Sequence, residues 1–518
     1  MSKTERDSLA QGMSRTQYYL LIASVMLATL IQILDQTIAN VALPHMQASL
    51  GATQDNISWV LTSYIIAQAV TIPITGWLTD RVGLRRVFLF SIIGFVTASM
   101  FCGIALNVEQ MVLFRLLQGM AGAFLGPLSQ TVILDLSTDR NRNQLMSIYG
   151  IGIMIGPIMG PIVGGSLTES FDWRWIFFIN IPLGLISFAG LFMLLPKTAR
   201  VRRPFDLFGF SLLALALGAL QLMLDRGQQA DWFNSWEIWI EAGVSVSAFW
   251  MLGVHLRTSS HPLYSREMFR DRNLVLGMFF FMIMGITFMG AMALLPILMQ
   301  RIYGYPVVTT GLLLSARGVG IMCTLAITGK LLSKTDPRFV IFAGFVISAL
   351  TYWQMAYWSL NNSSALIVMS GLVQGIGMGC LFLPVNILAY TTLDPKYRTD
   401  AVGLIYLART IGSSIGISIL MALLASSQQV SHAGIAAYIT PERLGIDLGR
   451  LALPENMASV GMAIMDMEVQ RQAAMIAFLN DFWLIAALLA IATPLAFIMR
   501  PLQKPKADGE PEYHPVVE

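Results

Sequence analysis

Charged residues are scarce in this chain. Asp, Glu, Lys and Arg make up 12% of its 518 residues, while hydrophobic residues make up 55%. Roughly a quarter of the residues in a soluble domain are charged, so this composition is typical of a protein embedded in a lipid bilayer. The net charge of +3 and the lack of a long basic run argue against a nucleic-acid partner.

Cysteine and the common cofactor motifs are also sparse or missing. Cys102, Cys323 and Cys380 lie in apolar segments without metal-ligand spacing, so we expect neither a disulfide framework nor a metal site. No GxxxxGK[ST] or HExxH sequence occurs, which argues against a P-loop ATP motor and a zinc hydrolase. We therefore expect no bound cofactor.

Long apolar runs dominate the sequence instead. A membrane-spanning helix needs roughly 20 mostly apolar residues, and fourteen segments meet this criterion. The segments lie near residues 18–42, 57–77, 87–106, 110–133, 145–167, 174–195, 206–224, 236–255, 274–299, 310–332, 339–357, 364–389, 400–424 and 479–499. The sequence thus predicts an all-α membrane protein with fourteen transmembrane helices.

The positions of Lys and Arg predict how these helices are oriented. With the N-terminus inside, the inside loops and tails hold 24 of the 33 Lys and Arg residues, the outside loops hold five, and four lie within the segments. Short cytoplasmic loops are enriched in Lys and Arg. We therefore expect a multi-pass protein of the bacterial inner membrane, with both termini in the cytoplasm.

A weak internal repeat divides the chain into two halves. Gly76 recurs as Gly329 at an offset of 253 residues, and Gln118 recurs as Gln374 at an offset of 256. Because this offset exceeds the length of six helices, we predict six helices, two inserted helices and six more. The predicted parts are a cytoplasmic segment 1–17, a six-helix bundle 18–195, an inserted pair with linkers 196–260, a second six-helix bundle 261–500 that includes a long periplasmic loop 425–478, and a disordered cytoplasmic tail 501–518.

The sequence GWLTDRVGLRR at 76–86 joins the second and third helices on the inside. Its glycines permit close backbone approach, and Asp80 can cap a helix or pair with a neighbouring arginine. We interpret it as a charged latch on an inside gate, although a basic turn that obeys the positive-inside rule would look the same. The candidate gate residues are Gly76, Asp80, Arg81, Gly83, Arg85 and Arg86.

The fifth helix carries glycine at every fourth position, interrupted by proline. This spacing places the glycines on one helix face and permits close helix contact, while proline can bend the helix. We interpret the stripe as a seam between the two halves with a hinge; ordinary tight packing is the alternative. The residues are Gly152, Gly156, Pro157, Gly160, Pro161, Gly164 and Gly165.

Asp35 is an acid within the first predicted helix, about seven residues from its outside end. Charged groups inside membrane spans are costly and usually face a cavity or a partner. Arg115 lies five residues from the outside end of the fourth helix, so the two depths match and the residues can pair. We expect this pair to exchange protons; a static ion pair that holds two helices together is the alternative.

Other polar residues in the spans are candidates for a central cavity. Asp35 is the one acid that we place near mid-membrane, against Arg115, Arg317 and Arg409. Such a cavity would be electropositive and would suit weak acids and neutral amphiphiles better than permanent cations. The candidate cavity residues are Gln36, Asn40, Gln118, Arg317, Gln374, Asn386 and Arg409.

Several of these sequences resemble those of a known family. GWLTDRVGLRR, Arg115-Leu-Leu-Gln118-Gly119 and GPIMGPIVGG at 156–165 resemble signatures of the major facilitator superfamily. LDQTIANVALP at 34–44 and DWRWIFFINIPLG at 172–184 resemble its fourteen-helix drug:proton antiporter branch. LQLMLDRGQQADWF at 220–233 is similar to the inner-membrane subunits of Emr-type tripartite pumps, and the resemblance covers roughly residues 18–500.

The resemblance implies the major facilitator fold and the export of hydrophobic or amphiphilic drugs, driven by the proton gradient without a cofactor. It also implies a role for Arg115 in proton transfer, and as partners a periplasmic adaptor of the EmrA/HlyD type and a TolC-like outer-membrane channel. The alternative within transporters is a dedicated exporter of one physiological metabolite. A membrane-embedded enzyme would need convergent catalytic groups, and a receptor a soluble output domain; the sequence shows neither.

Overall fold

The computed structural model describes residues 13–138, 141–197, 200, 203–332, 334–438 and 455–501. These residues form helices and short connections, without a β-strand in the ranges named. Fourteen of the helices are long and apolar enough to cross a membrane. The predicted all-α class and the number of spans are therefore confirmed. Residues 1–12 and 502–518, which hold most of the two predicted terminal segments, lie outside the described ranges.

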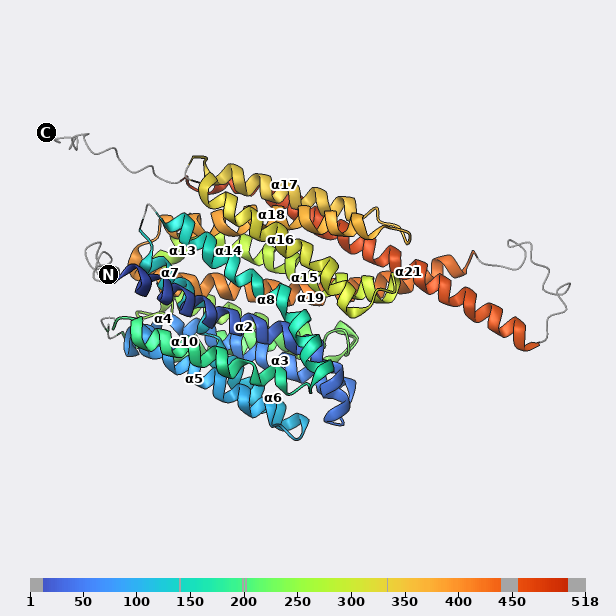
Figure 1. Cartoon of the computed structure of the whole chain (residues 1–518), viewed down its shortest axis with the longest axis horizontal. Coiled ribbons are helices and arrows are strands. Elements are labelled where there is room, and N and C mark those ends of the chain that lie inside the picture. Colours follow the sequence, from blue (N-terminus) through green and yellow to red (C-terminus); the bar gives the residue numbers. More distant parts are fainter. Residues whose placement is uncertain are drawn as a thin grey trace.

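The first six spans form the N-terminal half, most of which occupies the lower part of Figure 1. Its helices are α2 (Arg15–Ser49), α3 (Gln54–Thr71), η1 (Ile72–Ile74), α4 (Thr75–Val82), α5 (Leu84–Gly103), α6 (Val108–Gly122), α7 (Leu125–Leu136), α8 (Arg142–Ser170), α9 (Trp175–Phe178) and α10 (Asn180–Leu194). We call the end of the bundle at which α2 begins the N-terminal end, and the other end the opposite end.

The inserted pair and the C-terminal half follow. The inserted pair is α11 (Leu207–Arg226) and α12 (Trp236–Thr258), joined through η2 (Trp232–Asn234). The C-terminal half is α13 (Arg266–Arg270), α14 (Arg272–Met284), η3 (Gly285–Met289), α15 (Gly290–Ile297), η4 (Leu298–Ile302), α16 (Val307–Leu331), α17 (Pro337–Met355), α18 (Ser364–Thr391), η5 (Pro395–Tyr397), α19 (Arg398–Ala436), α21 (Glu455–Ala492) and η6 (Thr493–Ile498). The segments η3 and η4 are π-helical.

Polar residues fix where many of the helices begin. Ser14 forms a capping box with Gln17 at the start of α2, and Asn107 accepts a hydrogen bond from the backbone of Gln110 in α6. These caps satisfy backbone N–H groups that have no partner inside the helix. Gly83 separates α4 from α5 with a φ of 99°, a conformation that favours glycine. The predicted short turn between the second and third spans is thus present.

Close glycine contacts show that the two halves repeat one packing scheme. A Cβ on Gly156 or Gly160 of α8 would collide with α2, and a Cβ on Gly412 or Gly416 of α19 would collide with the α14–η3 segment. Likewise Gly119 of α6 packs on α3, and Gly375 of α18 packs on α16. The helices that follow the inserted pair therefore correspond to those before it, as parallel repeats in transporters do.

The inserted helix α11 lies against both halves. The Thr62 hydroxyl of α3 donates a hydrogen bond to the Asp225 carboxylate of α11. Ser418 of α19 donates to the carbonyl of Leu224 on the same helix. Helix α12 packs on α11. The insertion thus joins the two six-helix halves along the flank formed by α3 and α19.

The expected long loop at 425–478 is wrong for the residues that the structure describes. Helix α19 continues to Ala436, and α21 begins at Glu455 and runs to Ala492. Figure 1 shows α21 extending past the ends of the other helices at the opposite end. A prediction from hydropathy ends a membrane span where polar residues begin, although polar residues do not end a helix. The two helices also pair beyond their apolar parts, where His432 of α19 contacts Asp466 of α21 at 3.0 Å. Residues 439–454 lie outside the described ranges.

Candidate functional site: a buried ion-pair network

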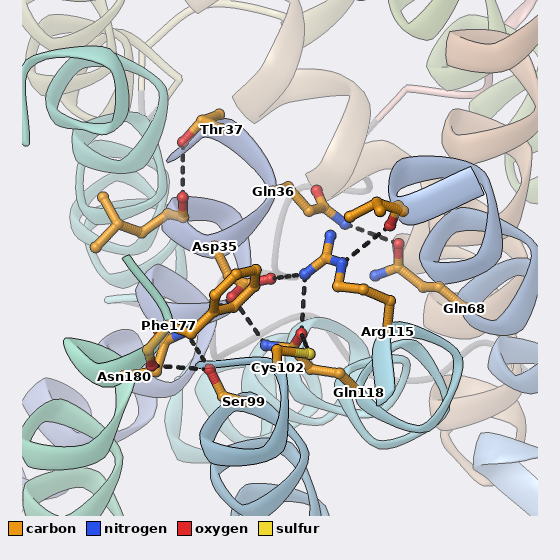
Figure 2. A network of polar contacts seen from close by, with 12 residues as sticks. Asp35, Gln36, Thr37, Gln68, Ser99, Cys102, Arg115, Gln118, Phe177 and Asn180 are labelled. Carbon is orange, nitrogen blue, oxygen red and sulfur yellow. Dashed lines mark hydrogen bonds and ion pairs between the residues drawn. The ribbon is translucent and has the colours of Figure 1, made fainter. Parts of the chain in front are cut away.

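Asp35 lies at the centre of a buried polar network in the N-terminal half (Figure 2). Its Oδ2 atom accepts a hydrogen bond from Nη1 of Arg115 at 2.6 Å, and both side chains are almost fully buried. Its Oδ1 atom accepts from the side-chain amides of Gln118 and Asn180, each at 2.8 Å. The ion pair expected from matching depths is therefore present, and the carboxylate has three donors.

Arg115 is held by contacts from three helices. Its Nε donates to the carbonyl of Val60 on α3 at 3.1 Å, and its Nη1 donates to Gln118 on its own helix. Its guanidinium carbon lies 4.3 Å from the ring centre of Tyr64. A cation over an aromatic face is stabilised by the ring electrons. The positive charge is thus fixed in place while the Asp35 carboxylate faces it.

Asn180 and Ser99 belong to the network but were not among the residues expected from the sequence. Asn180 begins α10, and its amide donates both to Asp35 and to Ser99 Oγ at 2.9 Å. Ser99 donates in turn to the carbonyl of Phe177. The sequence signal was present, because Asn180 is an amide within an apolar run, and amides buried in membrane spans need partners.

The candidate gate residues lie at the N-terminal end, but the expected partners of Asp80 are wrong. Asp80 contacts Nε of Arg203 at 3.3 Å, rather than Arg81, Arg85 or Arg86. Arg203 also donates two hydrogen bonds to Asp400 of α19, at 2.8 and 3.0 Å. The sequence could not indicate this cluster because Arg203 lies in the linker before the inserted helices, 123 residues after Asp80.

The other candidate gate residues lie in or beside this cluster of Asp80, Arg203 and Asp400. A Cβ on Gly76 would overlap the Asp400 carboxylate, so glycine is required there. Arg81 lies over the Trp77 ring, and Arg85 donates to the carbonyl of Phe192, while Arg86 is exposed. Burial alone disfavours the charged form of Arg203, but its hydrogen bonds to Asp400 and the negative charges of Asp400 and Asp80 raise its pKa.

Further contacts between the halves close the same end. Arg398 of α19 pairs with Asp135 of α7 at 2.9 Å. The next layer contains Gln130, which donates to Asn386 and Tyr390 of α18, and Tyr149, which contacts Tyr406 at 3.0 Å. These groups come from both halves and are mostly buried. The structure therefore shows the bundle closed at its N-terminal end.

The glycine stripe of α8 does not form the seam between the halves. Gly152, Gly156, Gly160 and Gly164 all face α2 of the same half, and Gly165 has no atom within 4 Å of a Cβ. The halves meet instead through another face of α8, where Ile158 packs on Gly318 of α16. Spacing by four fixes one face of a helix but does not indicate which neighbour that face meets. Helix α8 remains continuous through Pro157 and Pro161.

The candidate cavity residues are not gathered in one place. Gln118 belongs to the Asp35 network, Gln36 donates to Gln68 beside it at 2.8 Å, and Asn40 is exposed. Asn386 lies in the contact between the halves, and Gln374 is buried in α18. Arg409 lies over the ring of Tyr406 at 4.7 Å. Arg317 is buried on its own in the C-terminal half.

Asp481 is a second deeply placed acid, so the expectation of a single one is wrong. It is 1% exposed, and its Oδ2 atom has no hydrogen-bond partner among the described residues. It lies ten residues along α21 from Arg471, which donates to the carbonyl of Ile302, and this corresponds to about 15 Å along the helix. The predicted span began only at residue 479, which placed Asp481 at a helix end.

No group of His, Cys, Asp and Glu side chains able to hold a metal ion occurs in the described part of the chain. Its buried polar network consists of one ion pair and amide and hydroxyl donors around a carboxylate. The pair couples α2 to α6, because loss of the Asp35 charge would leave Arg115 buried without a counterion.

Comparison with known proteins identifies the family. The model of the Major Facilitator Superfamily matches residues 25–417. The chain belongs to the Major Facilitator Superfamily. Multidrug export protein EmrB of Escherichia coli (strain K12) is 31% identical over 493 residues, covering 94% of this chain and 96% of that protein. Fatty acid resistance protein FarB of Neisseria gonorrhoeae is 32% identical over 489 residues, covering 92% and 95%.

A solved structure agrees with this assignment at the level of the fold. The proton:xylose symporter XylE, also of the Major Facilitator Superfamily, superimposes with a TM-score of 0.62 at 12% identity, covering 94% of this chain and 96% of that one. Its family and its similarity to multidrug export proteins show that the chain is a multi-pass membrane transporter rather than an enzyme. The resemblance of its sequence to the superfamily and to Emr-type proteins is confirmed.

Proposed function

We propose that this chain exports hydrophobic and amphiphilic compounds from the cytoplasm or inner leaflet in exchange for protons. The observation that carries the proposal is the fully buried Asp35–Arg115 pair with its amide donors, in a superfamily member that is similar to proteins named for multidrug export. Intramembrane acids are rare and commonly lie on proton or substrate pathways. Asp35 is the proton carrier and Arg115 the group that senses its charge.

The N-terminal end is the cytoplasmic end in this proposal, because its loops carry most of the Lys and Arg. The structure then corresponds to a state closed toward the cytoplasm, with Asp35 ionised and paired. A proton arriving from the periplasm neutralises Asp35 and frees Arg115, which favours the return to a state open to the cytoplasm. Substrate bound from the cytoplasm favours release of the proton and export.

The test is proton movement in inside-out vesicles that hold an acidic lumen. A lipophilic weak acid, a neutral amphiphile and a lipophilic cation are added in turn while a pH dye reports the lumen. We expect at least one compound to trigger proton efflux with the wild type and none with Asp35→Asn. Asp35→Asn should still exchange labelled substrate across the membrane without a proton gradient, which shows that it is folded.

The matched control is Asp172→Asn, which removes an exposed acid beside Arg174 outside the network. It should behave as the wild type does. Substrate-triggered proton efflux of equal size in Asp35→Asn and the wild type would contradict the assignment of Asp35. Absence of a response to every compound in the wild type would contradict multidrug antiport itself.

We further propose that the paired ends of α19 and α21 contact a periplasmic adaptor, with a TolC-like channel beyond it. These ends, 425–436 and 455–471, form the part of the bundle that projects farthest (Figure 1). Val430, Ile464 and Met467 are 70%, 57% and 63% exposed there. Exposed apolar side chains on a projecting element are typical of protein-binding surfaces.

This contact predicts a difference between cells and vesicles. Ile464→Glu combined with Met467→Glu should lower resistance of cells to exported compounds, because the adaptor no longer binds, while proton antiport in vesicles stays within twofold of the wild type. Leu106→Glu changes an exposed apolar residue in the loop between α5 and α6 and should leave both unchanged. Equal resistance of the double variant and the wild type would contradict the proposed contact.

A further inference from the structure

Arg317 is a buried cation without a counterion. It lies on α16 and is 5% exposed, and its Nε and Nη2 atoms have no hydrogen-bond partner. Within the described ranges, no carboxylate forms an ion pair with it. An unpaired buried charge is strongly destabilising, and guanidinium N–H groups are donors only. The Arg317 guanidinium therefore needs a hydrogen-bond acceptor that the described part of the chain does not supply.

The internal repeat shows what is missing. Gly119 packs on the carbonyl of Tyr64 in the first half, and Gly375 packs on the carbonyl of Arg317 in the second, so Arg317 occupies the place of Tyr64. Tyr64 stacks on Arg115, whose charge is balanced by Asp35 of α2. The segment that corresponds to α2 instead presents Phe288, whose ring centre lies 5.7 Å from the Arg317 guanidinium carbon. The second half thus keeps a cation and an aromatic ring but has no acid opposite them.

A small cavity adjoins the guanidinium. Its volume is about 10 Å³, which is about what one water molecule needs, so a larger group enters only if the cavity wall moves. Arg317 and Trp358 supply its polar lining, and the Trp358 Nε1 atom is buried without a partner as well. Apolar side chains such as Leu295, Met299 and Met355 form the rest. The unsatisfied buried atoms of these two lining residues are all donors, so the fitting occupant is an acceptor with negative charge.

Two π-helical segments flank the same place. Phe288 belongs to η3 and Met299 belongs to η4, and α15 with its Pro296 lies between them. Single π-helical turns inside a longer helix are uncommon and often mark functional sites. The helix that covers the cavity is therefore irregular on both sides of it, as expected of a wall that adjusts to an occupant.

We propose that Arg317 and Trp358 form a subsite for the carboxylate of an amphiphilic weak acid, which supplies the negative charge that the second half lacks. This deepens the proposed export function and rests on it. Hydrogen bonds from the guanidinium and the indole to the anion bind the carboxylate. The wall between the two π-helical segments moves outward to admit it, and the apolar lining then contacts the first carbons of the tail. A small inorganic anion such as chloride has the same recognition chemistry, and the test separates the two sources.

The test measures binding to the purified protein in nanodiscs by calorimetry, with decanoate, decanol and sodium chloride as probes. We expect the wild type to bind decanoate more tightly than decanol by about tenfold or more, the factor that one good charged contact contributes. Arg317→Gln should remove this preference, and Arg317→Lys should restore part of it. Trp358→Phe should reduce it while leaving the affinity for decanol unchanged.

The matched control is Arg301→Gln, which removes an exposed arginine at the end of η4 and should bind as the wild type does. If chloride competes with decanoate in the wild type but not in Arg317→Gln, both anions use the subsite; if only chloride binds there, the carboxylate assignment is overturned. Unchanged binding of decanoate by Arg317→Gln overturns the subsite.

A transport measurement distinguishes failure of this inference from failure of the proposed function. Arg317→Gln should still couple export of the neutral amphiphile to proton efflux in vesicles, because Asp35 and Arg115 are intact. Loss of antiport for every compound in the wild type would contradict the proposed function, while the binding preference for decanoate would stand or fall independently.

Discussion

The buried guanidinium of Arg115 is held by several contacts that each require a defined position and direction. Its guanidinium donates to the carbonyl of Val60, to the carboxylate of Asp35 and to Gln118, and it lies beneath the ring of Tyr64. An ammonium group is a compact charge that cannot reproduce the planar arrangement of these donors. The position therefore demands arginine and not merely a positive charge.

Arg115→Lys is predicted to abolish proton-coupled export even though it keeps the charge. Lysine cannot reach Val60 and Asp35 together, so protonation of Asp35 no longer releases a fixed partner. We expect at least a tenfold loss of substrate-triggered proton efflux in vesicles, with folding judged by size-exclusion chromatography. Efflux within twofold of the wild type would show that charge alone suffices.

Among single residues, the sequence identified the charged members of the buried network but not all of its amide and hydroxyl members. Asp35 and Arg115 stand out because charged residues are rare in membrane spans, and their depths could be compared from helix ends. Asn180 and Ser99 were not identified, since an amide or hydroxyl in an apolar run has many ordinary partners. Arg203 was out of reach for a different reason: its linker is distant in the sequence from both acids that it contacts.

At the scale of elements, the stripe on α8 determines how closely two helices of one half approach. The hydroxyl oxygen and Cβ of Thr37 occupy the space that a Cβ on Gly160 would need, and Thr37 also donates to the carbonyl of Gly156. Small residues let helix backbones come together where no hydrophobic effect drives association. The stripe thus stabilises α2, the helix that carries Asp35.

Gly160→Ala is predicted to destabilise the protein, whereas Gly165→Ala is not. The added methyl group at position 160 must displace Thr37, and overpacking of this kind costs about 1–3 kcal/mol. A methyl group at position 165 meets no atom within 4 Å. Thermal unfolding in detergent should therefore show a lower melting temperature for the first variant only; similar melting temperatures would mean that α2 can move aside freely.

The number of membrane-spanning helices could be predicted from the sequence because it follows from the lengths of the apolar runs. The repeat of the two halves could be predicted because the closely packed glycines recur at similar spacing. The neighbours of each helix face could not. The stripe on α8 proved to meet α2, and the paired ends of α19 and α21 proved helical, because neither contact partners nor helix continuation in water are encoded in hydropathy.

At the scale of the whole molecule, three parts of the chain meet at the closed end. Asp80 comes from the first half, Asp400 from the second and Arg203 from the linker to the inserted helices. One guanidinium therefore bridges two carboxylates that repel each other across the boundary between the halves. Movement of the halves apart at this end must separate at least one of these ion pairs.

Arg203→Gln is predicted to shift the population toward a state open at this end. Without the guanidinium, the two carboxylates repel, while Asp135 and Arg398 remain paired. Spin labels at the exposed positions Lys197 and Lys334 should report longer distances in the variant by electron–electron double resonance. Lys396→Gln, an exposed change near Glu267 and Asp394 at the same end, is the control. Identical distance distributions in Arg203→Gln and the wild type would rule out a role for Arg203 in closure.

The position of α11 makes the two flanks of the molecule unequal toward the surrounding lipid. On one flank α11 forms hydrogen bonds with Thr62 and Ser418 and covers the junction of α3 and α19. Movement of one half relative to the other must therefore move α11 as well or break one of these hydrogen bonds. On the other flank α8 meets α16 directly, with Ile155 of α8 and Val319 of α16 exposed. The two junctions between the halves therefore differ in how much of them lipid can reach: α11 shields the first, while side chains of α8 and α16 are exposed beside the second.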